Sequence, residues 1–314
     1  MQEFGRRLRS IDALRGFAVV LMFLQHFPLW LMYQPEKSEF YMSMFAISRF
    51  AAPMFLLVVG ISMVLSAKRR ISNDGRNSAV KHLVWRGFFI ILAGFALNVV
   101  TFHSISDLNI LYTIGLSIIF LSALSTDPRP VKCLVYALVL YIISETVIKL
   151  DAIKNFLDMF QYPVLPWTIF VIFGIAIGNY ILVFQRDDRT KKLPYYLEFS
   201  AILLGILSIV FVMLGFPFRY WPYSTAPFIT ATTSLMLYFV AIFFWIYEVD
   251  GKNPVFLRPL IVYGRYALLL YFVHRILIVT IPELINMKNS FSETESIIAL
   301  LAFLLISWLL LRKR

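Results

Sequence analysis

Ten apolar runs divide the chain, and each is about the length that a helix needs to cross a lipid bilayer. A spanning helix requires roughly 20 mostly apolar residues to cross about 30 Å of hydrocarbon. Inside lipid, each spanning segment must satisfy its own backbone hydrogen bonds, which selects helices over irregular chain. The sequence therefore predicts an all-α, polytopic integral membrane protein with about ten transmembrane helices in one bundle. The expected spans are 10–32, 44–67, 82–102, 109–125, 132–149, 164–184, 195–215, 225–247, 259–284 and 295–311.

Composition excludes a soluble globular domain. Hydrophobic residues make up 60% of the chain and charged residues 15%, against roughly 45–50% and 25% in soluble domains. A soluble chain of 314 residues could not bury that much apolar surface in one core. The segments between the spans are too short to form a domain of their own. We therefore expect residues 1–314 to form a single transmembrane domain.

The net charge of +11 would suggest a nucleic-acid partner in a soluble protein, but the positions of the charges indicate a different role. With the N-terminus inside, 22 of the 29 basic residues fall in six clusters on the cytoplasmic side, which comprise the two tails, the loops and the inner ends of adjoining spans, Arg265 among them. An excess of Lys and Arg in cytoplasmic loops is the usual topology signal of membrane proteins. We expect both termini in the cytoplasm of a multi-pass cell-membrane protein, contacts between the basic clusters and anionic lipid, and no nucleic-acid partner.

Ionisable residues inside the spans are the best candidates for function, because a charge in lipid costs free energy. The first span contains Asp12, Arg15 and His26. Asp12 and Arg15 are three residues apart, so they share a helix face and can pair. Ser10 and Asp12 suit a helix start. His26 lies eleven residues after Arg15, on nearly the same face and about 16 Å along the axis. The simpler alternative is an interfacial arginine and a histidine that bonds a neighbouring helix.

The first span resembles the first helix of the transmembrane acyltransferase superfamily, which has an arginine and a histidine at this spacing after Ile-Asp-Ala-Leu. That superfamily includes the acyltransferase-3 proteins and the heparan-α-glucosaminide N-acetyltransferase-like proteins. Further segments are similar to the second branch and occur in the same order. They are Arg49–Ser62, Lys81–Asn98, Ile110–Ser117, Leu165–Trp167 with Gly174 and Gly178, and Tyr263–His274.

The resemblance implies an enzyme that moves an acetyl or other short acyl group from cytoplasmic acyl-CoA to an extracytoplasmic acceptor of the sugar or glycan class. Members of the human type are acetylated on a histidine in the lumenal segment before the second helix. The corresponding stretch here, residues 36–44, has no histidine. The catalytic prediction therefore falls on His26. The fourth helix also has Thr113 where relatives often have a basic residue.

The basic residues and histidines of the spans are the residue types that acyl transfer from CoA requires. The phosphates of CoA need fixed cations at the cytoplasmic mouth, and arginine matches phosphate geometry. A mid-membrane imidazole is expected to stay neutral, so it can act as a base or form an acyl-imidazole. His26 is the first catalytic candidate. His274 is the second, with Arg275 as an oxyanion partner. The residues predicted to bind acyl-CoA are Arg15, Asp12, Arg86, Arg70 and Lys81.

The acceptor is expected at the outer mouth, where aromatic and charged residues gather at span ends. The predicted acceptor-binding residues are Arg49, Glu39, Trp30 and Trp221. Aromatic side chains at these positions are also ordinary members of an interfacial belt, so their identity does not separate the two roles. The four histidines and the acidic residues are scattered, and we expect no metal site. The sequence leaves open whether the chain forms a homodimer.

Two other classes of protein compete with an acyltransferase. A transporter or lipid flippase also has many spans with buried charges, but it is expected to show inverted repeats, and we find none. A receptor or structural scaffold leaves Asp12, Arg15 and His26 unexplained. Binding of acyl-CoA from the cytoplasmic face distinguishes the acyltransferase from both.

Overall fold

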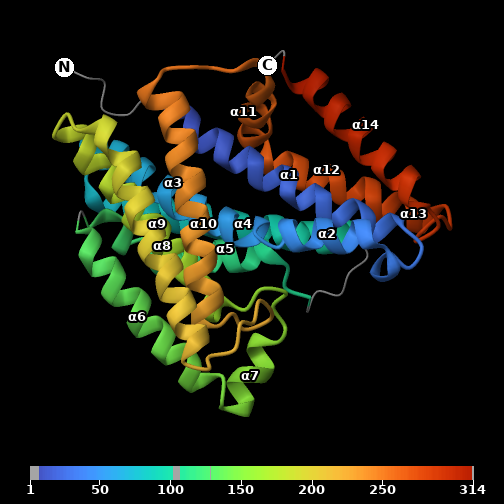
Figure 1. Cartoon of the computed structure of the whole chain (residues 1–314), viewed down its shortest axis with the longest axis horizontal. Coiled ribbons are helices and arrows are strands. Elements are labelled where there is room, and N and C mark those ends of the chain that lie inside the picture. Colours follow the sequence, from blue (N-terminus) through green and yellow to red (C-terminus); the bar gives the residue numbers. More distant parts are fainter. Residues whose placement is uncertain (1–6, 102–106, 128, 313–314) are drawn as a thin grey trace.

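A computed structural model describes residues 7–101, 107–127 and 129–312, and the chain in these ranges is almost entirely helical (Figure 1). Nine of the described helical stretches are long and apolar enough to cross a membrane, and Ile110–Leu121 is a shorter apolar helix. These ten segments correspond to the ten expected spans, and the all-α membrane fold is confirmed. The helices are α1 (Arg9–Leu31), α2 (Glu39–Ser48), α3 (Ala51–Asp74), α4 (Arg76–Val100), α5 (Ile110–Leu121), α6 (Pro130–Val147), α7 (Asp151–Leu157), α8 (Val164–Arg186), α9 (Leu193–Met213), α10 (Ala226–Phe244), α11 (Arg258–Arg265), α12 (Ala267–Arg275), α13 (Ile281–Leu284) and α14 (Glu293–Leu311).

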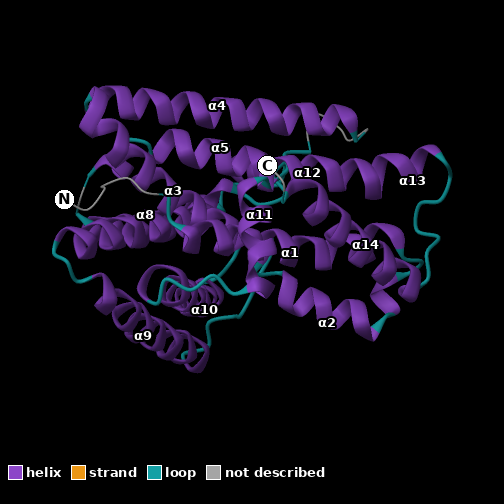
Figure 2. Cartoon of the chain, turned by 90° about the horizontal axis from the view of Figure 1, so that it is seen from above, coloured by secondary structure: helices purple, strands orange, loops and turns teal. Residues whose placement is uncertain are grey.

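The bundle has an inner group of helices and an outer group that faces lipid. Helices α1, α3, α8 and α10 bury most of their apolar residues, whereas α4, α6, α9 and α14 leave most of theirs exposed. Phe89 on α4 is 61% exposed and Phe199 on α9 is 62% exposed. Figure 2 shows α4 and α9 on opposite flanks with α3 and α8 between them. The exposed apolar side chains fit a bilayer, where lipid supplies their contacts.

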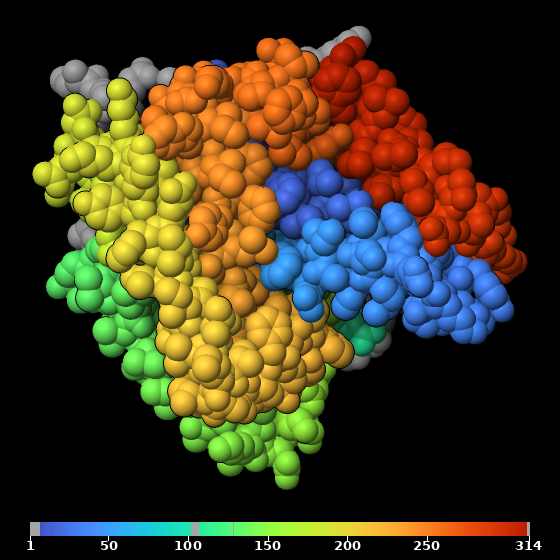
Figure 3. All heavy atoms as spheres, in the orientation of Figure 1, coloured from blue at the N-terminus to red at the C-terminus, as the bar shows by residue number. Residues whose placement is uncertain are grey.

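Hydrogen bonds join loops that are distant in sequence at each end of the bundle. At one end Arg76 donates to Thr126 (3.0 Å). This end also contains the basic clusters, and we call it the basic end. At the other end, which we call the opposite end, the amide of Tyr33 donates to the carbonyl of Phe291 (3.0 Å). Ser38 there donates to Glu293 (2.7 Å). Figure 3 shows these blue and red segments, from opposite ends of the sequence, meeting at the surface.

Two expected spans are broken rather than continuous. The span expected at 44–67 begins earlier, as α2, bends at Arg49 and Phe50, and continues as α3 to Asp74. Pro53 lies in the first turn of α3, where its missing N–H costs little. The span expected at 259–284 divides at Tyr266 into α11 and α12, and a π-helical turn, Ile276–Thr280, leads into α13. Helix α7, in the expected connection after residue 149, was not predicted.

The crossing of α1 and α11 depends on two glycines. A Cβ atom on Gly16 would lie 1.8 Å from the carbonyl oxygen of Leu260, and one on Gly264 would lie 1.8 Å from that of Asp12. No side chain can occupy either position without moving a backbone. The two helices therefore approach closely enough for the side chains of α1 to reach the backbone of α11.

Candidate functional site

A cavity of about 580 Å³ lies between α1, α3, α4, α5, α11 and α12. Toward the basic end its wall includes four basic side chains, Arg15, His82, Arg86 and Arg265. Farther along α1 the wall includes His26 and its neighbour Gln25. Arg15 and His26, which the sequence places on one helix face, therefore both line this cavity. One cavity is thus lined by fixed cations toward the basic end and by an imidazole farther along α1.

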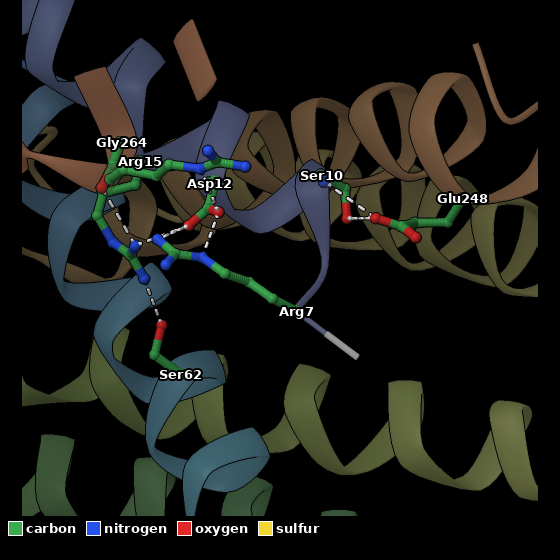
Figure 4. A network of polar contacts seen from close by, with 8 residues as sticks. Arg7, Ser10, Asp12, Arg15, Ser62, Glu248 and Gly264 are labelled. Atoms are coloured by element: carbon green, nitrogen blue, oxygen red, sulfur yellow. Dashed lines mark hydrogen bonds and ion pairs between the residues drawn. The ribbon is translucent and has the colours of Figure 1, made fainter. Parts of the chain in front are cut away.

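Asp12 is the centre of the polar network at the basic end of the cavity (Figure 4). Its side chain is only 4% exposed and pairs with Arg15 (3.1 Å) and Arg7 (2.6 Å). Arg265 approaches the same carboxylate at 3.9 Å. The predicted pairing of Asp12 with Arg15 is confirmed. Several cations around one buried carboxylate leave this region with an excess of positive charge.

Arg15 is held in place by neighbours on two other helices. One Nη donates to Ser62 on α3 at 2.8 Å, and the other donates to the carbonyl oxygen of Gly264 at 3.3 Å. That carbonyl lies near the end of α11, where the break at Tyr266 leaves the last carbonyls without helical partners. The broken ninth span thus supplies an acceptor that a continuous helix would not offer.

Ser10 has a different role from the one expected. It lies inside α1, which begins at Arg9, and its side chain does not cap the helix. Its amide and hydroxyl both donate to the carboxylate of Glu248, at 3.1 Å each. Figure 4 shows this contact beside the Asp12 network. Ser10 therefore joins the start of α1 to the segment after α10.

Arg86 differs from Arg15 in having no hydrogen-bond or ion-pair partner among the described residues, although it is partly buried and lines the cavity. His82, one turn earlier on α4, is exposed and also lines the cavity. A guanidinium with free donors in an enclosed space suits a phosphate. Arg86 is therefore the cation of this group that is most available to a ligand.

His26 and His274 are in direct contact. Nδ1 of His26 lies 3.0 Å from Nε2 of His274, and the two ring planes differ by 11°. His274 is completely buried, and its Nδ1 lies 3.0 Å from the carbonyl oxygen of Leu270. The two predicted catalytic histidines, 248 residues apart, thus belong to one hydrogen-bonded pair.

The partners of this pair fix where its protons lie. A carbonyl oxygen can only accept, so Nδ1 of neutral His274 carries the proton and its Nε2 is an acceptor. Nδ1 of His26 must then donate to that acceptor, which leaves Nε2 of His26 unprotonated. His26 lines the cavity, whereas His274 does not. His26 therefore offers a basic nitrogen that the pair does not use, and His274 orients it.

The other predicted donor residues lie outside the cavity wall. Arg70 pairs with Asp74 at 3.4 Å, and Lys81 is exposed. Both lie where α3 and α4 meet at the basic end, near His82. This position suits contacts with the outer part of a bound ligand. It does not suit contacts with the reacting group.

None of the four predicted acceptor residues lines the cavity. Glu39 is exposed at the start of α2, and Trp221 donates its indole N–H to the carbonyl of Gln161, which does line it. Trp30 lies beneath the guanidinium of Arg275, whose Cζ is 5.0 Å from the ring centre. Arg49 lies at the bend between α2 and α3. The structure brings Trp30 to Arg275 but does not gather the four into one cluster.

Several cavity residues were not predicted as site residues. They include Arg265, Gln25, Tyr271 and Tyr162. Two of them could have been found from the sequence: Gln25 is a polar residue beside His26, and Tyr271 lies one turn before His274. Tyr162 could not have been found, because it lies in the connection before α8, where its carbonyl accepts from Thr113. No cluster of potential metal ligands occurs within the part of the chain that the structure describes.

Comparison with known families identifies the chain. The family described as heparan-α-glucosaminide N-acetyltransferase, catalytic, matches residues 7–214. The chain belongs to this family. A search of curated proteins gives no match. Membership in the acetyltransferase family implies acetyltransferase activity in a membrane-embedded chain and favours an enzyme over a transporter. The matched range includes His26, Arg15 and Arg86, and it ends before the segment Tyr263–His274.

Proposed function

We propose that this protein transfers an acetyl or other short acyl group from cytoplasmic acyl-CoA to a sugar or glycan on the other side of the membrane. The observation that supports this most is the single cavity that has Arg15 and Arg86 toward one end and His26 farther along. An extended acyl-CoA has its phosphates and its thioester at opposite ends. The spacing of about 16 Å along α1 suits that separation.

In this proposal Arg86, with Arg15 and Arg265, binds the phosphates, and the pantetheine arm follows α1 toward His26. Nε2 of His26 removes the proton from an acceptor amine or hydroxyl. The acceptor atom then attacks the thioester carbonyl, the carbon–sulfur bond breaks, and the CoA thiolate leaves with a proton returned by His26. In the covalent alternative, Nε2 attacks the thioester first, the carbon–sulfur bond breaks and CoA leaves as its thiolate. The acceptor then attacks the cationic acyl-imidazole, the acyl–nitrogen bond breaks, and the acceptor's proton ends on the CoA thiolate.

Arg86→Ala is expected to weaken acetyl-CoA binding by about 1.5–3 kcal/mol, because a charged hydrogen bond is lost. This corresponds to roughly a 10- to 150-fold rise in Kd. The purified protein would be titrated with acetyl-CoA by calorimetry. Arg186→Ala is the matched control, since Arg186 is exposed at the basic end and pairs with Asp187 outside the cavity. Equal affinities for wild type and Arg86→Ala would contradict the donor site.

The proposal places the basic end in the cytoplasm. Single cysteines at Asn73 and Asn289, both exposed, are then expected to react from opposite sides of the membrane. Cys133 is buried, and replacing it with serine removes its background reaction. Labelling of intact cells with a membrane-impermeant maleimide should modify position 289 and leave position 73 unmodified until the cells are lysed. Labelling of both positions from the same side would contradict this topology.

A further inference from the structure

The helical wall beside His26 limits which groups can stabilise a negative charge at that point of the cavity. The proposed acyl transfer converts the thioester carbonyl into a tetrahedral intermediate whose oxygen carries a negative charge. His26 lies in the interior of α1, where each backbone N–H bonds the carbonyl four residues earlier. The backbone donors of this helix are therefore in use, and a donor for the oxyanion has to come from a side chain.

Arg275, expected from the sequence to be the oxyanion partner, does not line the cavity. Its guanidinium lies over the ring of Trp30, with Cζ 5.0 Å from the ring centre. The basic side chains that do line the cavity lie toward the basic end, where the phosphates are assigned. The donor is therefore to be found among the neutral polar side chains of the wall.

Tyr271 is a residue of the cavity wall that also contacts the histidine pair. It is 8% exposed, and its ring centre lies 5.3 Å from that of His274. The ring of His26 stacks on His274 with the same separation of 5.3 Å. His274 is completely buried and does not line the cavity. Tyr271 and His26 therefore both border the cavity beside one buried imidazole.

The hydroxyl of Tyr271 is free to bind a ligand. It makes no hydrogen bond with any residue in the described ranges, and it is not one of the fully enclosed polar atoms that lack a partner. Its donor therefore opens onto the cavity that Tyr271 lines. A phenol ordinarily loses its proton only near pH 10 or about there, so it remains a donor at neutral pH. A donor held in a site with little water stabilises charge better than the same donor in water.

Other neutral donors of the wall are less well placed. They are Gln25, Trp85, Gln161 and Tyr162. Trp85 is next to Arg86, toward the basic end. Tyr162 has the same 8% exposure as Tyr271, but its ring packs on Trp167, with the ring centres 4.7 Å apart. Gln25 precedes His26 on α1 and is the main competitor of Tyr271 for this role.

We propose that the hydroxyl of Tyr271 donates a hydrogen bond to the thioester oxygen and stabilises the oxyanion of the tetrahedral intermediate. As the attacking atom bonds to the carbonyl carbon, the π electrons of the carbonyl move onto oxygen, and Tyr271 stabilises that charge while keeping its own proton. When the carbonyl re-forms, the carbon–sulfur bond breaks and the CoA thiolate leaves. This inference rests on the proposed acyl transfer and adds a catalytic residue to it.

Tyr271→Phe, which removes only the hydroxyl, is expected to lower kcat by about 10- to 50-fold, because one hydrogen bond to a charged atom is lost. The Kd for acetyl-CoA, measured by calorimetry, should stay close to that of the wild type, since the phosphates bind toward the basic end. Tyr180→Phe is the matched control, because Tyr180 is an exposed tyrosine of α8 outside the cavity wall. A wild-type kcat in Tyr271→Phe would overturn the proposal.

The carbonyl stretch of bound acetyl-CoA reports this hydrogen bond directly, and a packing role of Tyr271 would not change it. Infrared spectra are recorded with acetyl-CoA that carries ¹³C at the acetyl carbonyl, in a His26→Ala background that suppresses transfer. Adding Tyr271→Phe to this background should raise the carbonyl frequency. Placing 3-fluorotyrosine, a stronger donor, at position 271 should lower it, and this provides the same measurement if Tyr271→Phe does not fold.

The outcomes that contradict the proposal are distinct from failure of the proposed function. Equal carbonyl frequencies with tyrosine, phenylalanine and 3-fluorotyrosine at position 271 would overturn it. A frequency that responds to Gln25→Leu or Tyr162→Phe but not to Tyr271→Phe would assign the oxyanion to another residue and also overturn it. Failure of the wild type to bind acetyl-CoA would instead remove the proposed acyl transfer itself.

Discussion

Replacing His26 with alanine is expected to lower the turnover of acyl transfer by about 10²–10⁴-fold, the usual contribution of a positioned proton-transfer group. The Kd for acetyl-CoA should stay close to that of the wild type, because the proposed phosphate site at Arg15 lies about 16 Å away along α1. Turnover would be measured at saturating acetyl-CoA and acceptor. Retained affinity shows that the variant is folded, so a loss of turnover alone locates the chemistry at His26.

The same residue separates the two chemical routes. Incubating the wild type with radiolabelled acetyl-CoA and no acceptor leaves label on His26 if the acyl group passes through an acyl-imidazole. Direct transfer within a ternary complex leaves no label on the protein. Near-wild-type turnover by His26→Ala would make the catalytic assignment wrong under both routes.

His274→Leu is expected to produce the second-largest loss, about 10²-fold in kcat, although His274 does not line the cavity. Without Nε2 of His274, nothing holds the proton of His26 on Nδ1, and the free nitrogen loses its orientation. The effect should fall on kcat, with KM for acetyl-CoA unchanged. Steady-state kinetics at varied donor concentration measure both quantities.

His274→Gln is the conservative variant that distinguishes positioning from packing. A glutamine side-chain oxygen can accept from Nδ1 of His26 as Nε2 of His274 does. We expect His274→Gln to recover at least a tenth of the wild-type kcat, while His274→Leu recovers much less. Equal losses in the two variants, with both proteins folded and binding acetyl-CoA, would show that the hydrogen bond to His26 is not what matters.

The first helix was the part of the site most open to prediction from sequence. Spacing alone placed Asp12 beside Arg15 and put Arg15 and His26 on one face, since both relations stay within one helix. The structure agrees, with an ion pair at 3.1 Å between Asp12 and Arg15 and with Arg15 and His26 in one cavity wall. Periodicity also located the spans, because burial in lipid needs little beyond length and hydrophobicity.

Contacts between residues of different helices could not be predicted from the sequence in the same way. The contact of His26 with His274 depends on how α12 packs on α1, which no local pattern encodes. The break at Tyr266 was missed because no proline or other local signal marks it in the sequence; it lies two residues after Gly264, where α11 approaches α1 closely. Arg265 was counted only among the basic residues that set the topology, because the break beside it was not predicted. Its place in the cavity wall follows only from that break.

A structure of the protein with a non-hydrolysable acetyl-CoA analogue tests the central claim most directly. The account predicts that the analogue occupies the cavity between α1, α4 and α12, with phosphate oxygens within hydrogen-bond distance of Arg86. The acetyl carbon should lie within about 3–3.5 Å of Nε2 of His26, the distance at which reacting atoms are poised for attack. An analogue bound elsewhere, or one whose acetyl group points away from His26, would contradict the account.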